Sequence, residues 1–371
     1  MRTLCVMLLL LTLCVPLVSA ETDTLYSQQV EAAGAGELIE QLPADLQELL
    51  TEMQFDPLDP TSYTDLDVAT VTDMLWTLLQ RQSAGPMQVM GTLMGVVLVC
   101  ALFTGWDGLG GTLRQTYHGV AVLGAGSTLL VPLAALLTTV QETVERVTVF
   151  LSSFIPVYAA VVAAGGRAVS ALSYQTTLLG ACQLLVWLVR MVVFPLITVS
   201  LALGCTGSLT DGFCLDGFSG AIHKCVLWMM GLFSTVFSGL LSLQQMVAAA
   251  GDSLSGRVMK YSLSSFVPVV GGLLGEVYNT VVGCAGLLRS TVGGFGLLAT
   301  VLILLPPLLS CICWSVGLHL AESTAALFGL VPIERLCRTA AGAVKVLIAL
   351  LAVFALVMVV SVSTVVFSAG R

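Results

Sequence analysis

The sequence predicts an all-α, polytopic helical membrane protein with about seven to eight transmembrane helices. Hydrophobic residues make up 57% of the chain and charged residues 10%, whereas soluble domains carry about 25% charged residues. The apolar runs are as long as membrane spans and do not alternate with polar residues, which favours helices over a barrel. A further observation is a stretch that occurs twice, with a proline and a glycine pair in each copy.

Residues 1–20 have the composition of a secretory signal peptide. Arg2 supplies the positive charge, residues 4–13 form the apolar core, and the small residues VSA at 18–20 form a cleavage site. Cleavage and an uncleaved anchor both remain open, and the short apolar core favours cleavage. In either case we expect the following segment to lie outside the cytoplasm.

Residues 21–82 form an acidic extracytoplasmic segment. Thirteen of the 22 acidic residues of the chain lie here, against Arg81 as the single basic residue. The sequence predicts two short helices, over 45–54 and 65–81, with the turn DPLDP between them. Two interpretations stay open: a solvated linker, or a surface that docks an extracytoplasmic partner, since so small a piece buries little by itself.

Residues 83–371 form the predicted membrane domain, with basic residues concentrated in the loops expected inside. If the N-terminus is outside, Arg114, Arg167 and Arg257 lie on the inner side, as the positive-inside rule requires. Lys224 and Arg289 are exceptions at outer edges. The eight candidate spans are 87–104, 117–138, 154–172, 176–203, 226–248, 265–288, 295–319 and 346–367.

The repeated stretch begins at residues 152 and 264, as SSFIPV and SSFVPV. A repeated break that carries a charge often marks the working centre of transport-type proteins. A duplicated segment whose small residues let helices pack closely is the other interpretation. The eight-span topology makes the two copies inverted relative to each other. The candidate residues are Pro156, Gly165, Gly166 and Arg167 in the first copy, and Pro268, Gly271, Gly272 and Glu276 in the second.

Charges within apolar runs are the strongest site candidates, because ionisable groups inside a membrane usually face the bundle interior or a wet cavity. Arg167 and Glu276 are expected to pair across the repeat. Arg190 lies near the middle of the predicted span 176–203. Snorkelling to the surface is the alternative for Arg190, and its position near mid-span makes that harder.

The sequence predicts no catalytic, cofactor-binding or metal-binding residues. Gly217–Gly220 has the form GxSG of some intramembrane proteases, with His319 in a later span, but Ser219 is expected in a loop. Asp252 follows a glycine as in half of an aspartyl site, and no second aspartate lies within a span to share the proton. Cys205 and Cys214 share an outer loop, where an oxidising space would allow them to pair.

Several stretches together resemble the stage III sporulation protein AE family. They are SFIPVYAAVVAAGGRAVSAL with the following QTTLLGACQLLVWLVRMVVFPLITVS, and SFVPVVGGLL with the later GLLRSTVGGFGLLATVLILLPPL. The resemblance extends from about Met87 to the end of the chain, and the proline and Gly-Gly pattern in both copies is its most specific part. The acidic segment is similar only in character, and the loop 204–220 departs from the family.

The resemblance implies a membrane subunit of the channel or secretion-like complex that links mother cell and forespore and supports late forespore development. It further implies an outer forespore membrane location, with the acidic segment extracytoplasmic. Other membrane subunits of the stage III sporulation complex and membrane lipid are the expected partners, without nucleic acid, cofactor or enzymatic activity. The competing hypothesis is an autonomous secondary transporter of a small solute, which the repeat and the apolar-run charges favour.

Overall fold

The computed structural model describes residues 68–104, 111–209, 215–266 and 271–367, together with Gln47 and Thr51. Apart from turns at 165–167 and 328–330, every described residue is helical. The predicted all-α class is therefore confirmed. Gln47 and Thr51 are both helical, and the Thr51 hydroxyl donates to the Gln47 carbonyl at 2.7 Å, in agreement with the helix predicted over 45–54.

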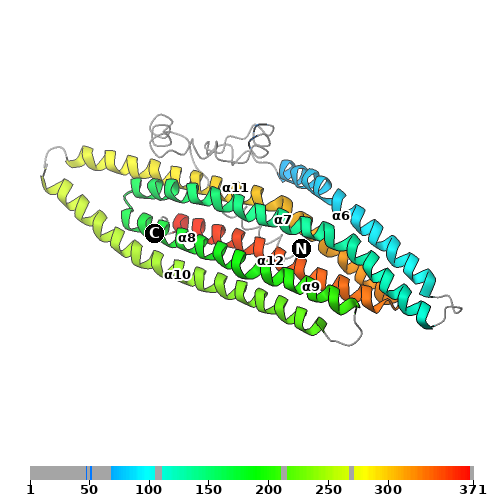
Figure 1. Cartoon of the computed structure of the whole chain (residues 1–371). Helices are drawn as coiled ribbons and strands as arrows, with labels where there is room; N and C mark the ends of the chain where they lie inside the picture. Colours follow the sequence, from blue (N-terminus) through cyan, green and yellow to red (C-terminus); the bar gives the residue numbers. More distant parts are fainter. Residues whose placement is uncertain are drawn as a thin grey trace.

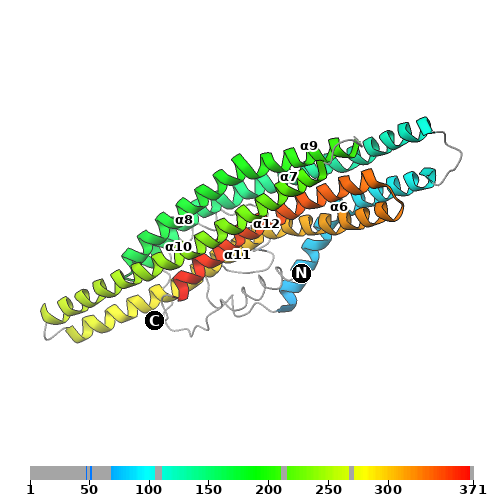
Figure 2. The same cartoon turned by 90° about the horizontal axis from the view of Figure 1, so that it is seen from below.

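The helices lie alongside one another in an elongated bundle (Figures 1 and 2). The chain stays helical from α8 to α9 through η1, a π-helical turn, so these three elements form one continuous arm. The elements are α6 (Val68–Thr104), α7 (Gly111–Ala164), α8 (Ala168–Leu188), η1 (Val189–Val193), α9 (Phe194–Leu209), α10 (Leu215–Phe266), α11 (Gly271–Leu327) and α12 (Val331–Phe367).

The antiparallel pair α11–α12 forms the centre of the bundle. It makes the most extensive helix–helix contact; α12 also packs against α9 and α10, and α11 against α6 and α7. Accordingly the apolar parts of α11 and α12 are mostly buried, whereas those of α6 and α10 are mostly exposed. Figure 1 shows α10 along one outer edge of the bundle and α6 along the other.

The bundle has two ends, each with a turn that contains a glycine of positive φ. At one end α7 turns into α8 at Gly166, whose φ is 78°, and α10 gives way to α11 (Figure 1). At the other end α11 turns into α12 at Gly329, whose φ is 69°. Glycine adopts this left-handed conformation at no steric cost, and so commonly follows a helix C-terminus. We call these the Gly166 end and the Gly329 end.

Among the described residues, six helical segments are long and apolar enough to cross a membrane. The predicted count of eight spans is not confirmed, because two pairs of predicted spans merge. The run 117–138 and most of 154–172 share α7, with the end of the second run in the turn and the start of α8; most of 265–288 and all of 295–319 share α11. Glu142 and Glu145, which separated the first pair in the sequence, are exposed on the surface of a continuous helix.

The first copy of the repeat runs toward the Gly166 end, whereas the second copy starts at that end and continues along α11 away from it. The first copy lies on α7 and ends in the turn at the Gly166 end. The second begins at the end of α10, and α10 contacts the start of α8 at that same end through Asp252. The described helical parts of the two copies therefore run in opposite directions, and the inverted arrangement stays a prediction. Arg114 and Arg167 likewise lie near opposite ends of α7, so a single crossing by this helix cannot place both on one side.

Helix α6 runs across the boundary expected between the acidic segment and the membrane domain. The predicted helix 65–81 and the predicted span 87–104 form one helix, Val68–Thr104, with Pro86 inside it. A proline within a helix removes one backbone hydrogen bond, and neighbouring helices can satisfy the freed carbonyl.

Next to the Gly166 end, five helical segments contain no acidic or basic residues. Together they form a charge-free layer of the bundle. The shortest segment, 147–164 of α7, is about 27 Å long at about 1.5 Å per residue, close to the roughly 30 Å hydrocarbon core of a bilayer. Charged residues bound the layer on both sides: Arg167, Asp252 and Arg289 on one, and Arg146, Arg190 and Lys345 on the other. The segments are 147–164, 168–189, 225–251, 290–318 and 346–367.

Candidate functional site

The Gly-Gly pair of the first copy ends α7 and forms the turn into α8. The N–H of Gly165 donates to the carbonyl of Val161 at 3.3 Å, and that of Gly166 to the carbonyl of Ala163 at 2.9 Å. Arg167 follows with φ −115° and ψ 57° and leads into α8. The break expected within a span is thus a turn at one end of the bundle.

Asp252 of α10 caps the first turn of α8. Its Oδ1 accepts the backbone N–H of Val169 at 3.0 Å, and its Oδ2 accepts that of Ser170 at 3.1 Å. The first N–H groups of a helix have no partner inside the helix, and a carboxylate also suits the positive end of the helix dipole. The carboxylate that stood out in the sequence after Gly251 is therefore a buried cap that ties α10 to the turn, with 8% of the residue exposed.

Arg289 of α11 is buried at the same end, with 9% of its surface exposed. Its electrostatic neighbours are Tyr158 and Arg167. The α11 backbone approaches the turn, since a Cβ added to Gly165 would lie 3.6 Å from that of Ala285. From the sequence, Arg289 is expected at an outer edge of the membrane domain, without a functional role. The available signal was an arginine within the apolar run GLLRSTVGGFGLL.

A stack of buried aromatic rings extends from Arg289 into the bundle. The ring centroids of Phe154 and Tyr158 are 5.3 Å apart in a stacked arrangement, and those of Tyr158 and Tyr174 are 5.3 Å apart edge to face. Gly296 of α11 makes room for this stack, because a Cβ there would collide with the ring of Phe154. The rings are Phe150, Phe154 and Tyr158 of α7, Tyr174 of α8 and Phe295 of α11.

Arg190 lies on the outer surface of the bundle, in the π-helical turn η1. Its Nη2 donates to Oε1 of Glu145 on α7 at 2.6 Å, and the two side chains are 55% and 57% exposed. The expectation that Arg190 faces the interior is therefore wrong. Sequence position alone could not decide which face of the helix carries the side chain, and the ion pair lies at the boundary of the charge-free layer.

The second copy is described only in part. Gly271 and Gly272 begin α11, whereas Pro268 and the side chain of Glu276 lie outside the described residues. The pairing of Arg167 with Glu276 therefore stays a prediction. The backbones of the two residues are far apart for such a pair. Helix α11 meets the Gly166 turn at Ala285, nine residues after Glu276, which is about 13 Å along the helix axis.

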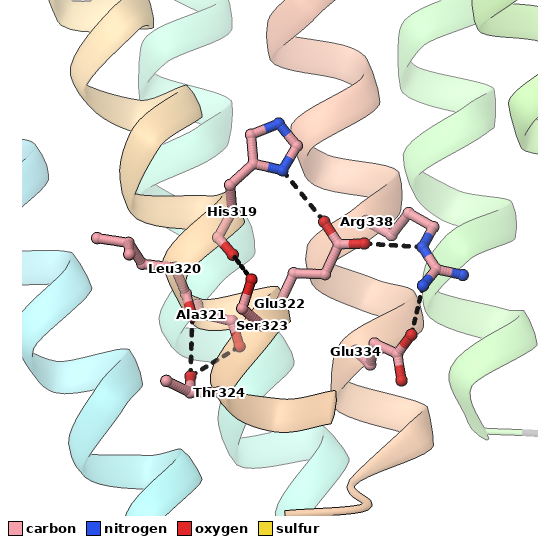
Figure 3. Close-up of polar contacts among 8 residues, drawn as sticks. All are labelled: His319, Leu320, Ala321, Glu322, Ser323, Thr324, Glu334 and Arg338. Carbon is pink, nitrogen blue, oxygen red and sulfur yellow. Dashed lines mark hydrogen bonds and ion pairs between the residues drawn. The ribbon is translucent and has the colours of Figure 1, made fainter. Parts of the chain in front are cut away.

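A second polar cluster lies toward the Gly329 end, where α11 and α12 come together (Figure 3). Nε of Arg338 donates to Oε1 of Glu322 at 2.8 Å, and its Nη2 donates to Oε1 of Glu334. The other carboxylate oxygen of Glu322 contacts Nδ1 of His319 at 3.2 Å. Arg338 is 58% exposed, so this cluster is an ion-paired network on the surface.

Ser200 of α9 and His223 of α10 form a buried hydrogen bond near the central helix. The Ser200 hydroxyl donates to the carbonyl of Ile197 at 2.7 Å, so its oxygen accepts from Nε2 of His223 at 2.8 Å. Gly342 of α12 makes room for the imidazole, because a Cβ there would collide with the ring. With its proton directed to a backbone carbonyl, this serine joins helices and is not arranged as a nucleophile.

The protease-like residues are not arranged as a catalytic pair. Ser219 lies within the first turns of α10, which corrects the expected loop position, and it is 3% exposed. His319 contacts Glu322. Within the described ranges no three His, Cys, Asp or Glu residues are grouped to hold a metal ion. Cys214 lies outside those ranges, so its disulfide with Cys205 stays a prediction.

The fold and its polar clusters define a class: a polytopic helical membrane protein whose buried charges gather at the turns and ends of a bundle. A sequence model described as Stage III sporulation protein AE matches residues 60–370, a range that includes every helix from α6 to α12. The chain therefore belongs to the stage III sporulation protein AE family, as the resemblance predicted.

A curated relative agrees with this assignment. The chain is 26% identical over 230 residues to Stage III sporulation protein AE of Bacillus subtilis (strain 168), a match that covers 62% of this chain and 57% of that protein. The match thus spans less than two thirds of the relative. No solved structure matches the chain.

Proposed function

We propose that the protein is a membrane subunit of a sporulation channel or secretion-like complex that links mother cell and forespore and supports late forespore development. The observation that carries the proposal is the family match over residues 60–370, which includes every helix from α6 to α12. We place the protein in the outer forespore membrane, with its acidic N-terminal segment extracytoplasmic. Its role is non-enzymatic, and it uses no cofactor, metal or nucleic acid.

The outer face of α10 supports a role among other membrane subunits. This helix is the least buried of the long helices together with α6. Its exposed apolar side chains recur every three or four residues, which forms a stripe along one face. In a membrane such a stripe contacts lipid or another transmembrane helix. Its members are Trp228, Leu232, Val236, Leu240, Leu243 and Val247.

Affinity purification from sporulating cells tests the proposal. The full chain, tagged at its C-terminus and extracted in mild detergent, is expected to bring with it other membrane proteins that are made only during sporulation. A tagged unrelated polytopic protein expressed at the same stage is the control. Recovery of the chain alone, at a level similar to the control, would contradict the proposal.

The acidic segment gives a second test of the complex. If it docks an extracytoplasmic partner, deletion of residues 37–73 is expected to leave the protein inserted at normal level, because helices α7 to α12 remain intact. The same deletion should abolish spore formation and the recovery of at least one copurifying protein. Normal sporulation of the deletion strain would reduce the segment to a linker.

A buried polar group inside the bundle favours the alternative of a secondary transporter. Gln245 of α10 is 6% exposed, and neither atom of its side-chain amide has a hydrogen-bond partner among the described residues. Buried polar groups without partners are costly unless water or a solute satisfies them. A chain that purifies alone and carries a solute into proteoliposomes would establish this alternative.

A further inference from the structure

Arg289 is a buried arginine whose Nε has no acceptor among the residues that the structure describes. Only 9% of the residue is exposed. A guanidinium is charged at all physiological pH values, and leaving such a group buried and unpaired is strongly unfavourable. A group that offers anionic oxygen atoms is therefore expected beside it.

The two carboxylates nearest to this end in the chain do not supply that group. Asp252 already accepts backbone N–H groups of α8 with both of its oxygens. Glu276 lies on the same continuous helix as Arg289, thirteen residues earlier, which separates their backbones by roughly 20 Å along the axis. That separation exceeds the combined reach of a glutamate and an arginine side chain.

The surroundings of Arg289 are positively charged. Arg167 is an electrostatic neighbour, and two guanidinium groups in a medium of low dielectric constant repel each other. Arg167 also marks the N-terminus of α8, the positive end of that helix. The hydroxyl of Ser170, in the first turn of α8, is buried without a hydrogen-bond partner among the described residues. This end of the bundle therefore favours an anion with several acceptor oxygens.

The location matches the phosphate level of a bilayer. Arg289 lies directly at the edge of the charge-free layer, whose shortest segment is about 27 Å long. The polar headgroups of a bilayer flank a hydrocarbon core of roughly 30 Å. A lipid phosphate is consequently available at the depth where Arg289 lies.

We propose that Arg289, together with the α7–α8 turn, binds a phosphate group at the membrane interface. The ligand chemistry is that of a phosphate monoanion, carried by an anionic lipid headgroup or by inorganic phosphate. The planar guanidinium matches two phosphate oxygens in a fork, a geometry that a lysine ammonium does not reproduce. The phosphate fills the position between the helices α7, α8 and α11 and joins them where α11 passes the turn.

Native mass spectrometry of the full chain tests the site. The purified protein is equilibrated in detergent with phosphatidylglycerol or with phosphatidylcholine, and retained lipid is counted. The wild-type chain is expected to retain one phosphatidylglycerol, and Arg289→Gln is expected to bind it about tenfold more weakly, because a charge-assisted fork is lost. Arg190→Gln is the matched control: it removes an exposed arginine far from the turn and should bind as the wild type does.

Two further measurements keep the test decisive. Arg289→Lys retains the charge without the fork, and its affinity is expected between those of the wild type and Arg289→Gln, even if the glutamine variant folds poorly. Millimolar inorganic phosphate that displaces the bound lipid identifies a site for free phosphate as well, whereas lipid that resists displacement identifies the headgroup as the ligand. Equal lipid retention by wild type, Arg289→Lys and Arg190→Gln would overturn the proposal, and so would retention that does not distinguish the two lipids.

Discussion

The two ends of the bundle turn their helices in the same way but satisfy their charges differently. At the Gly329 end, the N–H of Gly329 donates to Ala326 at 3.1 Å and that of Leu330 to Ala325 at 2.9 Å, much as hydrogen bonds close the Gly166 turn. Yet Arg338 there has two carboxylate partners at the surface (Figure 3). At the Gly166 end the carboxylate of Asp252 is bound to backbone N–H groups instead.

This difference shows that the hydrogen bonds of a helix turn fix the backbone, whereas the neighbouring helices determine which partners the charged side chains have. An exposed ion pair such as that of Arg338 contributes about 0–1 kcal/mol, because water competes for both groups. A buried carboxylate that accepts two N–H groups contributes more, because removing it leaves buried donors without partners. The Gly166 end is therefore expected to matter more to stability and function than the more highly charged Gly329 end.

Reporter fusions give the largest expected effect, because they test whether the two ends lie on opposite sides of the membrane. Fusions after Gly166 and after Phe266 should report one side, and fusions after Leu209 and after Phe328 the other. The eight-span topology instead places the positions after Gly166 and Phe328 on the same side. A shared location for these two fusions would restore eight spans and contradict the single crossing of each long helix.

Removal of the buried cap should produce the largest loss of stability at the Gly166 end. Asp252→Ala is expected to lower the free energy of unfolding by about 2–3 kcal/mol, because two buried N–H groups lose their acceptor. Asp252→Asn retains one acceptor oxygen and should lose less. Thermal unfolding in detergent measures both. An alanine variant as stable as the wild type would show that the cap does not hold α10 against α8.

Filling the space beside the aromatic stack tests how tightly α11 packs behind the Gly166 turn. Gly296→Ala places a methyl group against the ring of Phe154, and overpacking of this kind costs about 1–3 kcal/mol. Gly286→Ala is the control on the same helix, since nothing lies within 4 Å of its added Cβ. The control should be neutral or slightly stabilising, because alanine favours a helix over glycine. Equal midpoints of thermal unfolding for the two variants would contradict the close approach.

Mutation of the surface ion-pair network at the Gly329 end should lower the free energy of unfolding least. Glu322→Gln removes the carboxylate that contacts both Arg338 and His319, and we expect a loss of about 0–1 kcal/mol. The loss should shrink further in high salt, because salt screens exposed charges. The measurement is thermal unfolding at two salt concentrations. A loss as large as that of Asp252→Ala would remove the contrast between the two ends.

The sequence by itself determined the class and much of the local structure. Long apolar runs cannot remain in water and must satisfy their backbone groups internally in lipid, so they predict helices that cross a membrane. The glycine pair at Gly165 and Gly166 predicted a break, because glycine permits the left-handed turn that ends α7. The quoted family stretches predicted the family that the comparison then showed.

Only the tertiary structure decided which of these charges are buried and which apolar runs join into one continuous helix. Arg190 in the run WLVRMVV and Arg289 in the run GLLRSTV have nearly the same sequence surroundings. Arg190 is more than half exposed and paired with Glu145, whereas Arg289 is buried beside Arg167. The physical reason is that burial depends on which face of each helix meets its neighbours. In these helices that choice is made by contacts between segments distant in the chain, such as Asp252 with α8.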